Sequence, residues 1–145
     1  MTVFEPPFSA NFKFPIYNSA LYGLGDRNMV KKGPAKKLSI YVDESDKVGG
    51  TPVYEALIKL CYRNKISGVS VFRGVAGYGS DGVLHTSKIL ELSTTLPVKI
   101  EAVDSEEMIA SLLPEVTELV QKGLVEVSDT EVIKCCVPPS TPGRR

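Results

Sequence analysis

The sequence predicts an α+β fold, a ferredoxin-like β-α-β-β-α-β sandwich with a four-stranded antiparallel sheet and two helices on one of its faces. Two observations carry this prediction. Two apolar patterns at helical spacing each lie between strand-like segments, and a long glycine-containing segment separates the two β-α-β units. With 145 residues, the chain is long enough for one domain with its own hydrophobic core.

The first β-α-β unit begins with residues 37–43, KLSIYVD, where apolar and polar residues alternate as in a strand. The first helix is expected at residues 51–64, with Thr51 as its N-cap and Pro52 at its first helical position. Its buried face is expected to contain four apolar residues at helical spacing: Val53, Leu57, Leu60 and Cys61. The second strand is expected at residues 69–76, VSVFRGVA.

The second unit begins with residues 96–104, LPVKIEAVD, which predict the third strand. Asp104 and Glu107 have the spacing of a capping box and are expected to start the second helix. The inner face of this helix is expected to contain Met108, Leu112, Val116 and Leu119. Pro114 lies inside the same pattern and is expected to kink the helix or to separate its first half as a turn.

The limits of the domain follow from where regular patterns begin and end. The fourth strand is expected at residues 124–129, with residues 131–137 as a candidate strand to pair with it. Residues 1–36 are rich in aromatic residues, proline and glycine without a sustained period, so we expect a partly disordered N-terminal extension. The ferredoxin-like domain is expected to span residues 37–136, followed by a flexible, proline-rich tail at residues 137–145.

Composition excludes several classes of function. The chain has 17 basic and 17 acidic residues, which argues against a protein that coats nucleic acid or an anionic membrane. Three cysteines and one histidine give no plausible zinc-ligand spacing. The cysteines are expected to be free thiols in a reducing compartment. Without a transmembrane-length apolar run or a signal-peptide pattern, the sequence predicts a soluble, cytoplasmic protein.

The segment GYGSDG, which contains Gly77 and Gly79, has the G-x-G-x-x-G spacing of a dinucleotide-binding fingerprint. That interpretation needs a helix that opens directly at the glycines and a larger parallel sheet than this chain can form, so we disfavour it. We expect residues 77–95 to form a long loop, in which glycines with positive φ present backbone N–H groups to an anion. Arg73 and His85 would add charge and hydrogen bonds. The alternative is that the glycines only turn the chain.

Several segments together resemble a PII-like family that is catalogued as a domain of unknown function, with members that sometimes lie beside ion channels or transporters. The segments are KKLSIYVDE, GVSVFRGVAGYG, His85, LPVKIEAVD and KGLVEV. More distantly, the chain is similar to the PII nitrogen-regulatory signalling proteins. The resemblance implies a homotrimer of ferredoxin-like subunits with ligand clefts between neighbours, where an adenine nucleotide changes the loop that contacts a target protein.

Seven residues are candidates for ligand binding: Ser70, Arg73, Gly74, Gly77, Gly79, His85 and Lys122. By position, the resemblance implies roles for Ser70, Arg73, Gly77 and Gly79. Ser70 would lie near the base, and Arg73 and the loop glycines near the phosphates. Ser80 and Asp81 stand where PII proteins have Arg-Gln, and Lys122 is the only obvious cation in QKGLVEVSD, the reduced counterpart of their phosphate-binding loop. The ligand therefore stays open among AMP, ADP, ATP, a cyclic nucleotide, another anion or no nucleotide.

Three classes of function follow. We favour a non-enzymatic regulator that senses a small anionic ligand and relays its presence through residues 77–95 to a partner such as a membrane transporter or channel. A trimeric interaction scaffold, with the aromatic N-terminal segment as a docking peptide, is the alternative. A small enzyme is less favoured, because one histidine leaves no legible catalytic constellation and the Arg cradle of the acylphosphatases, which share this topology, is not matched.

Overall fold

The structure, a computed structural model, describes residues 29–86 and 95–135. Four long strands form one antiparallel sheet in the order β4-β7-β1-β8, and two short two-stranded pairs lie outside it. The elements, in chain order, are β1 (Gly33–Asp43), β2 (Lys47–Val48), β3 (Thr51–Pro52), α1 (Val53–Arg63), β4 (Val69–Arg73), β5 (Ala76–Gly77), β6 (His85–Thr86), β7 (Pro97–Asp104), α2 (Glu106–Leu119) and β8 (Leu124–Val132).

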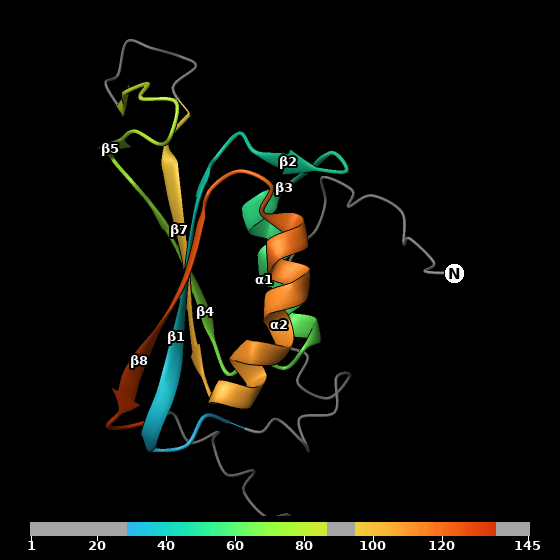
Figure 1. The fold of residues 1–145 in the computed structure, drawn as a ribbon, viewed down its shortest axis with the longest axis vertical. Coiled ribbons are helices and arrows are strands. Elements are labelled where there is room, and N and C mark those ends of the chain that lie inside the picture. Colours follow the sequence, from blue (N-terminus) through green and yellow to red (C-terminus); the bar gives the residue numbers. More distant parts are fainter. Residues whose placement is uncertain (1–28, 87–94, 136–145) are drawn as a thin grey trace, which may run out of the picture.

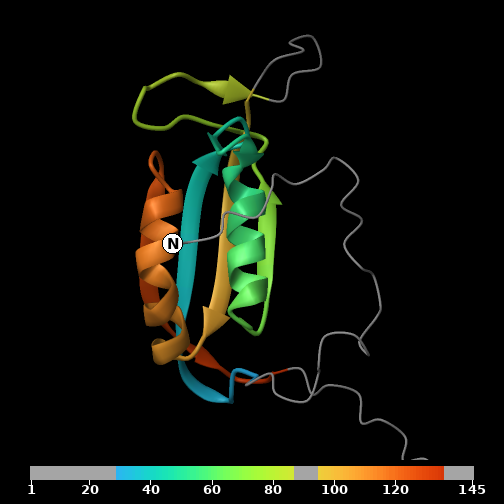
Figure 2. The same ribbon diagram turned by 90° about the vertical axis from the view of Figure 1, so that its right-hand side faces the viewer.

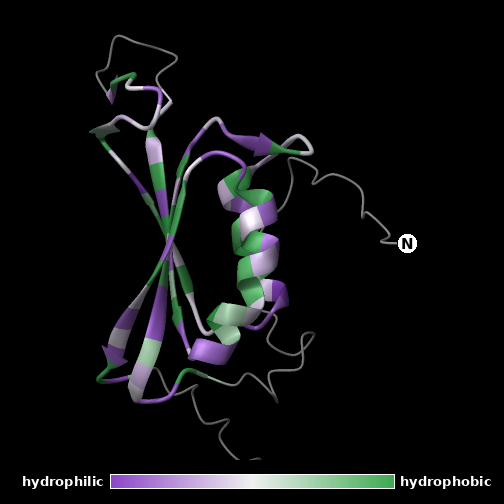
Figure 3. Ribbon diagram, viewed as in Figure 1, coloured by the Kyte–Doolittle hydropathy of each residue, from purple (hydrophilic) through white to green (hydrophobic). Residues whose placement is uncertain are grey.

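Both helices cover the same face of the sheet (Figure 1) and lie side by side across it (Figure 2). The helix-facing residues of β1 alternate along the strand as the sequence predicts, and Leu38, Ile40 and Val42 are all buried. Hydrophobic stretches of the sheet and of the helices lie opposite one another (Figure 3), and their buried apolar residues form one core cluster. The predicted ferredoxin-like α+β sandwich is therefore confirmed.

The first helix begins later than its sequence pattern predicts. Thr51 does not cap it, because Thr51 and Pro52 form β3 and pair with β2. Pro52 has extended backbone angles, and the N–H of Val53 donates to the carbonyl of Asp46 at 2.9 Å. At the start of the helix, a backbone carbonyl from the preceding turn thus accepts a hydrogen bond from an N–H group. The sequence pattern predicted a side-chain cap in this role.

The second helix also begins one residue later than expected. Its N-cap is Ser105, whose hydroxyl accepts a hydrogen bond from the N–H of Met108 at 3.3 Å, so Asp104 and Glu107 do not form the predicted capping box. Asp104 is buried instead, and its carboxylate accepts hydrogen bonds from the N–H groups of Ser67 at 2.8 Å and Ser105 at 2.7 Å. This carboxylate joins the segment before β4 to the start of α2.

The helix α2 runs unbroken through Pro114, so the predicted separation of its first half into a turn is wrong. Proline removes one backbone hydrogen bond from a helix, but here buried side chains on both sides of it pack on the sheet. These buried residues are Ile109, Leu112 and Val116. Met108 and Leu119, expected on the inner face, are only partly buried against the core.

The last strand is longer than predicted. Residues 124–132 form the single strand β8, so residues 131 and 132 continue it and do not pair back onto it. The reason lies in β1, which begins at Gly33, four residues before the predicted start, and offers β8 a partner along Gly33–Tyr41. Neither helix of the described chain is long and apolar enough to cross a membrane.

Cys61 is buried in the core, and burial raises the pKa of its thiol to about 11. We therefore expect the folded protein to protect Cys61 from alkylation at neutral pH, because only the thiolate reacts. Relative to the urea-unfolded chain, labelling should slow by roughly 100-fold or more, measured by mass spectrometry of the Cys61 peptide. Half-buried Cys135 is the internal reference. Equal labelling of Cys61 in the folded and unfolded chain would show that the thiol is not buried in the core.

Candidate functional site

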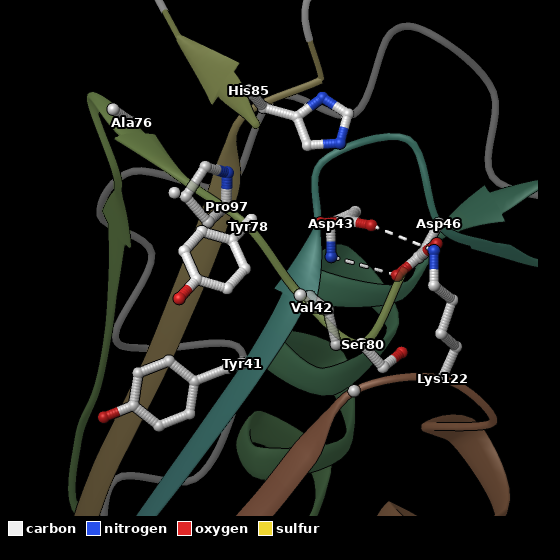
Figure 4. A pocket seen from close by; sticks show the side chains of 13 residues that line it. Tyr41, Val42, Asp43, Asp46, Ala76, Tyr78, Ser80, His85, Pro97 and Lys122 are labelled. Carbon is white, nitrogen blue, oxygen red and sulfur yellow. Dashed lines mark hydrogen bonds and ion pairs between the residues drawn. The ribbon is translucent and has the colours of Figure 1, made fainter. Parts of the chain in front are cut away.

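A pocket of about 310 Å³ lies at one end of the sheet, where β1 ends, β7 begins and the β5–β6 pair folds over them. The turn before β8 closes its other side. It is lined by Tyr41, Val42, Asp43, Asp46, Ala76, Gly77, Tyr78, Gly79, Ser80, His85, Pro97, Lys122 and Gly123. Side chains from four separate parts of the chain thus face one space (Figure 4).

Two glycines let the chain pass close to Pro97 at the wall of this pocket. The N–H of Gly74 donates to the carbonyl of Pro97 at 2.7 Å, and a Cβ on Gly74 would stand 2.7 Å from the Cγ of Pro97. A Cβ on Gly77 would stand 3.1 Å from the same atom. This close approach of Gly74 to Pro97 sets the direction in which the chain leaves β4.

The β5–β6 pair brings His85 to the pocket. Gly77 pairs with His85 and Ala76 pairs with Thr86, so the start of the glycine-containing loop is tied to a point eight residues later. Neither Gly77 nor Gly79 has the positive φ expected of an anion-binding nest. Among the described residues of this segment, the positive φ is that of Gly82, at +69°. Because Gly77 is extended in β5, its missing side chain serves packing against Pro97. Residues 87–94, the later part of the predicted loop, lie outside the described residues.

Lys122 is held by carboxylates. Its Nζ lies 3.2 Å from Oδ2 of Asp43 and 3.8 Å from Oδ2 of Asp81. Asp43, with smaller contributions from Asp46 and Asp81, raises the pKa of Lys122 above its ordinary value. Asp43 is itself held in place, because its backbone N–H donates to Oδ2 of Asp46 at 2.9 Å. The cation of the pocket therefore stands among three acidic side chains.

Gly123 fixes the path of the turn that carries Lys122. Its φ is +141°, and a Cβ built on it would stand 2.3 Å from the carbonyl oxygen of Tyr41. The close contact arises because β8 begins at Leu124, which pairs with Tyr41. Only glycine fits between the turn and β1 here, so this position locates Lys122 relative to Asp43.

The pocket has two chemically different sides (Figure 4). Tyr41, Tyr78 and Pro97 form an aromatic and apolar side, and Tyr78 is 74% exposed. Asp43 and Lys122 belong to the charged side. Such an arrangement suits a small molecule with a planar apolar part and a polar or anionic part.

Four of the seven sequence-predicted site residues line this pocket: Gly77, Gly79, His85 and Lys122. Arg73 forms an ion pair with Glu44, with its Nη2 2.9 Å from Oε2. Ser70 lines a different pocket of about 640 Å³, together with Ser67 and Glu101. Gly74 does not line the pocket, although its contact with Pro97 shapes the wall.

Sequence reasoning missed Tyr41, Asp43, Asp46 and Tyr78. The sequence carries one usable signal for them: Asp43 ends the first strand, and a ferredoxin-like topology brings that strand end beside the start of the third strand. Among the residues that the structure describes, no group of three or more histidine, cysteine or acidic side chains is placed to hold a metal ion.

The fold is a ferredoxin-like sandwich, and its pocket is lined by both paired ends of the β5–β6 segment, which follows the second long strand. The model of the family DUF190, described as "Uncharacterized ACR, COG1993", matches residues 35–132, and the chain belongs to this family. The resemblance stated from the sequence is thereby confirmed.

Relatives match over most of their own lengths. A UPF0166 protein of Methanocaldococcus jannaschii is 43% identical over 101 residues, which are 69% of this chain and 93% of the relative. A UPF0166 protein of Aquifex aeolicus is 35% identical over 105 residues, 72% of this chain and 96% of the relative.

Among solved structures, CPII of Thiomonas intermedia K12 is similar in fold. It is a nitrogen regulatory PII-like protein, and the structure has ADP, AMP and bicarbonate bound. The match has a TM-score of 0.56 and 25% identity, and it covers 72% of this chain and 93% of the other.

Proposed function

We propose that this chain is a non-enzymatic PII-like regulatory protein that binds an adenine nucleotide in the pocket and relays its presence to a partner protein through residues 77–95. One observation carries the proposal. The pocket wall includes both paired ends of the first part of that segment, Gly77 and His85, so a ligand in the pocket contacts the segment directly. Ligand binding would then shift the populations of loop conformations that a partner reads.

The two sides of the pocket support a nucleotide as the ligand. An adenine ring would lie on the Tyr41 and Tyr78 side, where aromatic surface is accessible, and a phosphate would lie toward Lys122 and His85. A volume of about 310 Å³ is at the lower end of small-molecule pockets, which favours a mononucleotide over a larger ligand. ADP and AMP bound to CPII are consistent with this class of ligand.

Charge restricts the ligand further. Asp43 and Asp46 line the pocket, and Asp81 lies beside it, while Lys122 is their near cation. Each added phosphate charge is repelled by these carboxylates unless a cation intervenes. We therefore propose AMP or a cyclic nucleotide ahead of free ATP, and we expect Mg²⁺ to improve the binding of ADP and ATP.

The open face of the sheet supports association of several copies, which we propose form a homotrimer with the pocket near the cleft between neighbours. A row of paired residues crosses all four strands on the side away from the core: Phe72, Lys99, Tyr41 and Leu124. Phe72 and Leu124 each have 54% of their surface accessible, an apolar exposure that a partner surface would cover. Lys99 lies over the Tyr41 ring, with its Nζ 5.6 Å from the centroid.

Calorimetric titration with AMP, ADP, ATP and cyclic AMP, with and without Mg²⁺, tests the nucleotide proposal. We expect binding of one nucleotide, weakened about ten-fold or more by Lys122→Met, because a charge-assisted hydrogen bond to the phosphate is lost. Lys47→Met, which removes an exposed cation from β2, is the matched control and should bind as the wild type does.

Light scattering and circular dichroism would establish that both variants keep the mass and fold of the wild type. If no nucleotide gives a heat of binding at millimolar concentration, the proposal of a nucleotide sensor is wrong. The interaction scaffold is then the function that remains. That alternative predicts that removal of residues 1–28 abolishes partner binding while the domain stays folded.

A further inference from the structure

Asp81 points a carboxylate at the cation of the pocket from the loop itself. It lies between β5 and β6, and its Oδ2 is 3.8 Å from Nζ of Lys122, which belongs to the turn before β8. Its other oxygen, Oδ1, accepts a hydrogen bond from the N–H of Val83 at 3.0 Å. The turn around it is closed by a hydrogen bond from the N–H of Gly82 to the carbonyl of Gly79 at 3.0 Å.

The surroundings of the Asp81 side chain favour its ionised form. The hydrogen bond from Val83 lowers its pKa below the ordinary value, with further contributions from Lys122 and His85. A carboxylate in this position presents to Lys122 what an anionic ligand would present, an oxygen with negative charge.

The two carboxylates that hold Lys122 differ in how they are attached. Asp43 ends the central strand β1, and its N–H is bonded to the carboxylate of Asp46, so it moves only with the sheet. The hydrogen bonds described for the Asp81 side chain and its turn are made within residues 79–83. Lys122 thus has one partner fixed to the sheet and one partner carried by the loop.

We infer that Asp81 occupies the position of the ligand's anionic group beside Lys122, so that the Asp81–Lys122 pair and a bound phosphate or carboxylate exclude each other. This inference rests on the proposed function and explains how the ligand reaches the loop. The anion takes Lys122, repulsion displaces Asp81, and residues 79–83 lose their attachment to the turn before β8. Because coupling is reciprocal, the Asp81–Lys122 pair weakens ligand binding by the same factor by which a bound ligand weakens the pair.

The first arm of the test uses the ligand-free protein. Asp81→Asn removes the charge but keeps an oxygen for Val83, and Lys122→Met removes the cation. We expect each variant to raise hydrogen exchange within residues 79–83 by about two- to five-fold, and the double variant to add little, because both changes break one pair. Asp129→Asn, which breaks the exposed pair with Lys36 elsewhere on the sheet, is the matched control and should leave this exchange unchanged.

The second arm compares AMP with adenosine, which lacks the phosphate. Asp81→Asn should bind AMP about five-fold more tightly than the wild type at low salt, and adenosine with unchanged affinity. Added salt should reduce the difference for AMP. The control Asp129→Asn should change neither affinity.

The outcomes separate this inference from the proposed function. If AMP binds the wild type and Asp81→Asn with equal affinity, the exclusion of Asp81 by the ligand is wrong and the nucleotide site stands. If AMP and adenosine both gain equally in Asp81→Asn, the carboxylate does not compete with the phosphate and the inference is overturned. If neither protein binds any nucleotide, the proposed function and the inference fail together.

Discussion

Gly123→Ala is expected to lower the free energy of unfolding by about 3 kcal/mol, through backbone strain and a steric clash together. The residue has a φ of +141°, which side-chain-bearing residues rarely adopt, and a Cβ there would stand 2.3 Å from the carbonyl oxygen of Tyr41. Relief of this contact requires the turn to move away from β1. Urea unfolding followed by circular dichroism would measure the loss.

Gly33→Ala is the matched control for this prediction. Gly33 has a φ of +122°, but nothing lies within 4 Å of a Cβ built on it. Its loss of stability should reflect strain alone, at about 1 kcal/mol. Equal unfolding midpoints for the two variants would show that the close contact at Gly123 does not limit the turn. A Gly123→Ala protein that stays folded should also bind nucleotide more weakly, since Lys122 is displaced.

Asp104→Ala is expected to cost about 3 kcal/mol of stability. The carboxylate is 1% exposed and accepts hydrogen bonds from the N–H groups of Ser67 and Ser105, both of which would lose a buried acceptor. Each unsatisfied buried donor costs roughly 1–3 kcal/mol. Thermal and urea unfolding of the purified variant would measure the effect.

Asp129→Ala provides the comparison for Asp104. It removes a carboxylate of the same size from β8, where its side chain is 89% exposed and pairs with Lys36. An exposed ion pair of this kind is worth about 0–1 kcal/mol. If Asp104→Ala were no more costly than Asp129→Ala, water or a rearranged backbone would have to replace the lost acceptor.

The class of fold could be predicted from the sequence because its core residues follow simple periods. Leu38, Ile40 and Val42 alternate along β1, and the buried residues of α1 recur at helical spacing as expected. The ends of the elements could not be predicted in the same way. Pro52 belongs to β3 because it pairs with β2. Asp104 is buried, and its carboxylate accepts a hydrogen bond from the N–H of Ser67. Both outcomes depend on residues distant from the local pattern.

Some residues of the candidate site could be predicted from the local sequence, and others could not. His85 and Gly77 could be predicted because they stand near each other in a recognisable loop, whereas Tyr41 and Asp43 join them only through the order of strands in the sheet. Arg73 was expected near a phosphate, but the sequence does not reveal that Glu44 is close enough to pair with it. A local motif predicts which chemistry is present, and the topology decides which groups meet.

The position of β1 in the sheet has a consequence for how the chain folds. This strand is the first of the four long strands in the chain, yet it pairs with β7 and β8, which come late in the chain. During synthesis, β1 therefore leaves the ribosome well before β7 and β8 are made. Until then, its apolar side chains lack the neighbouring strands of the sheet. Because contacts so distant in sequence carry a large loop-closure cost, we expect refolding to be slower than that of helical domains of the same size.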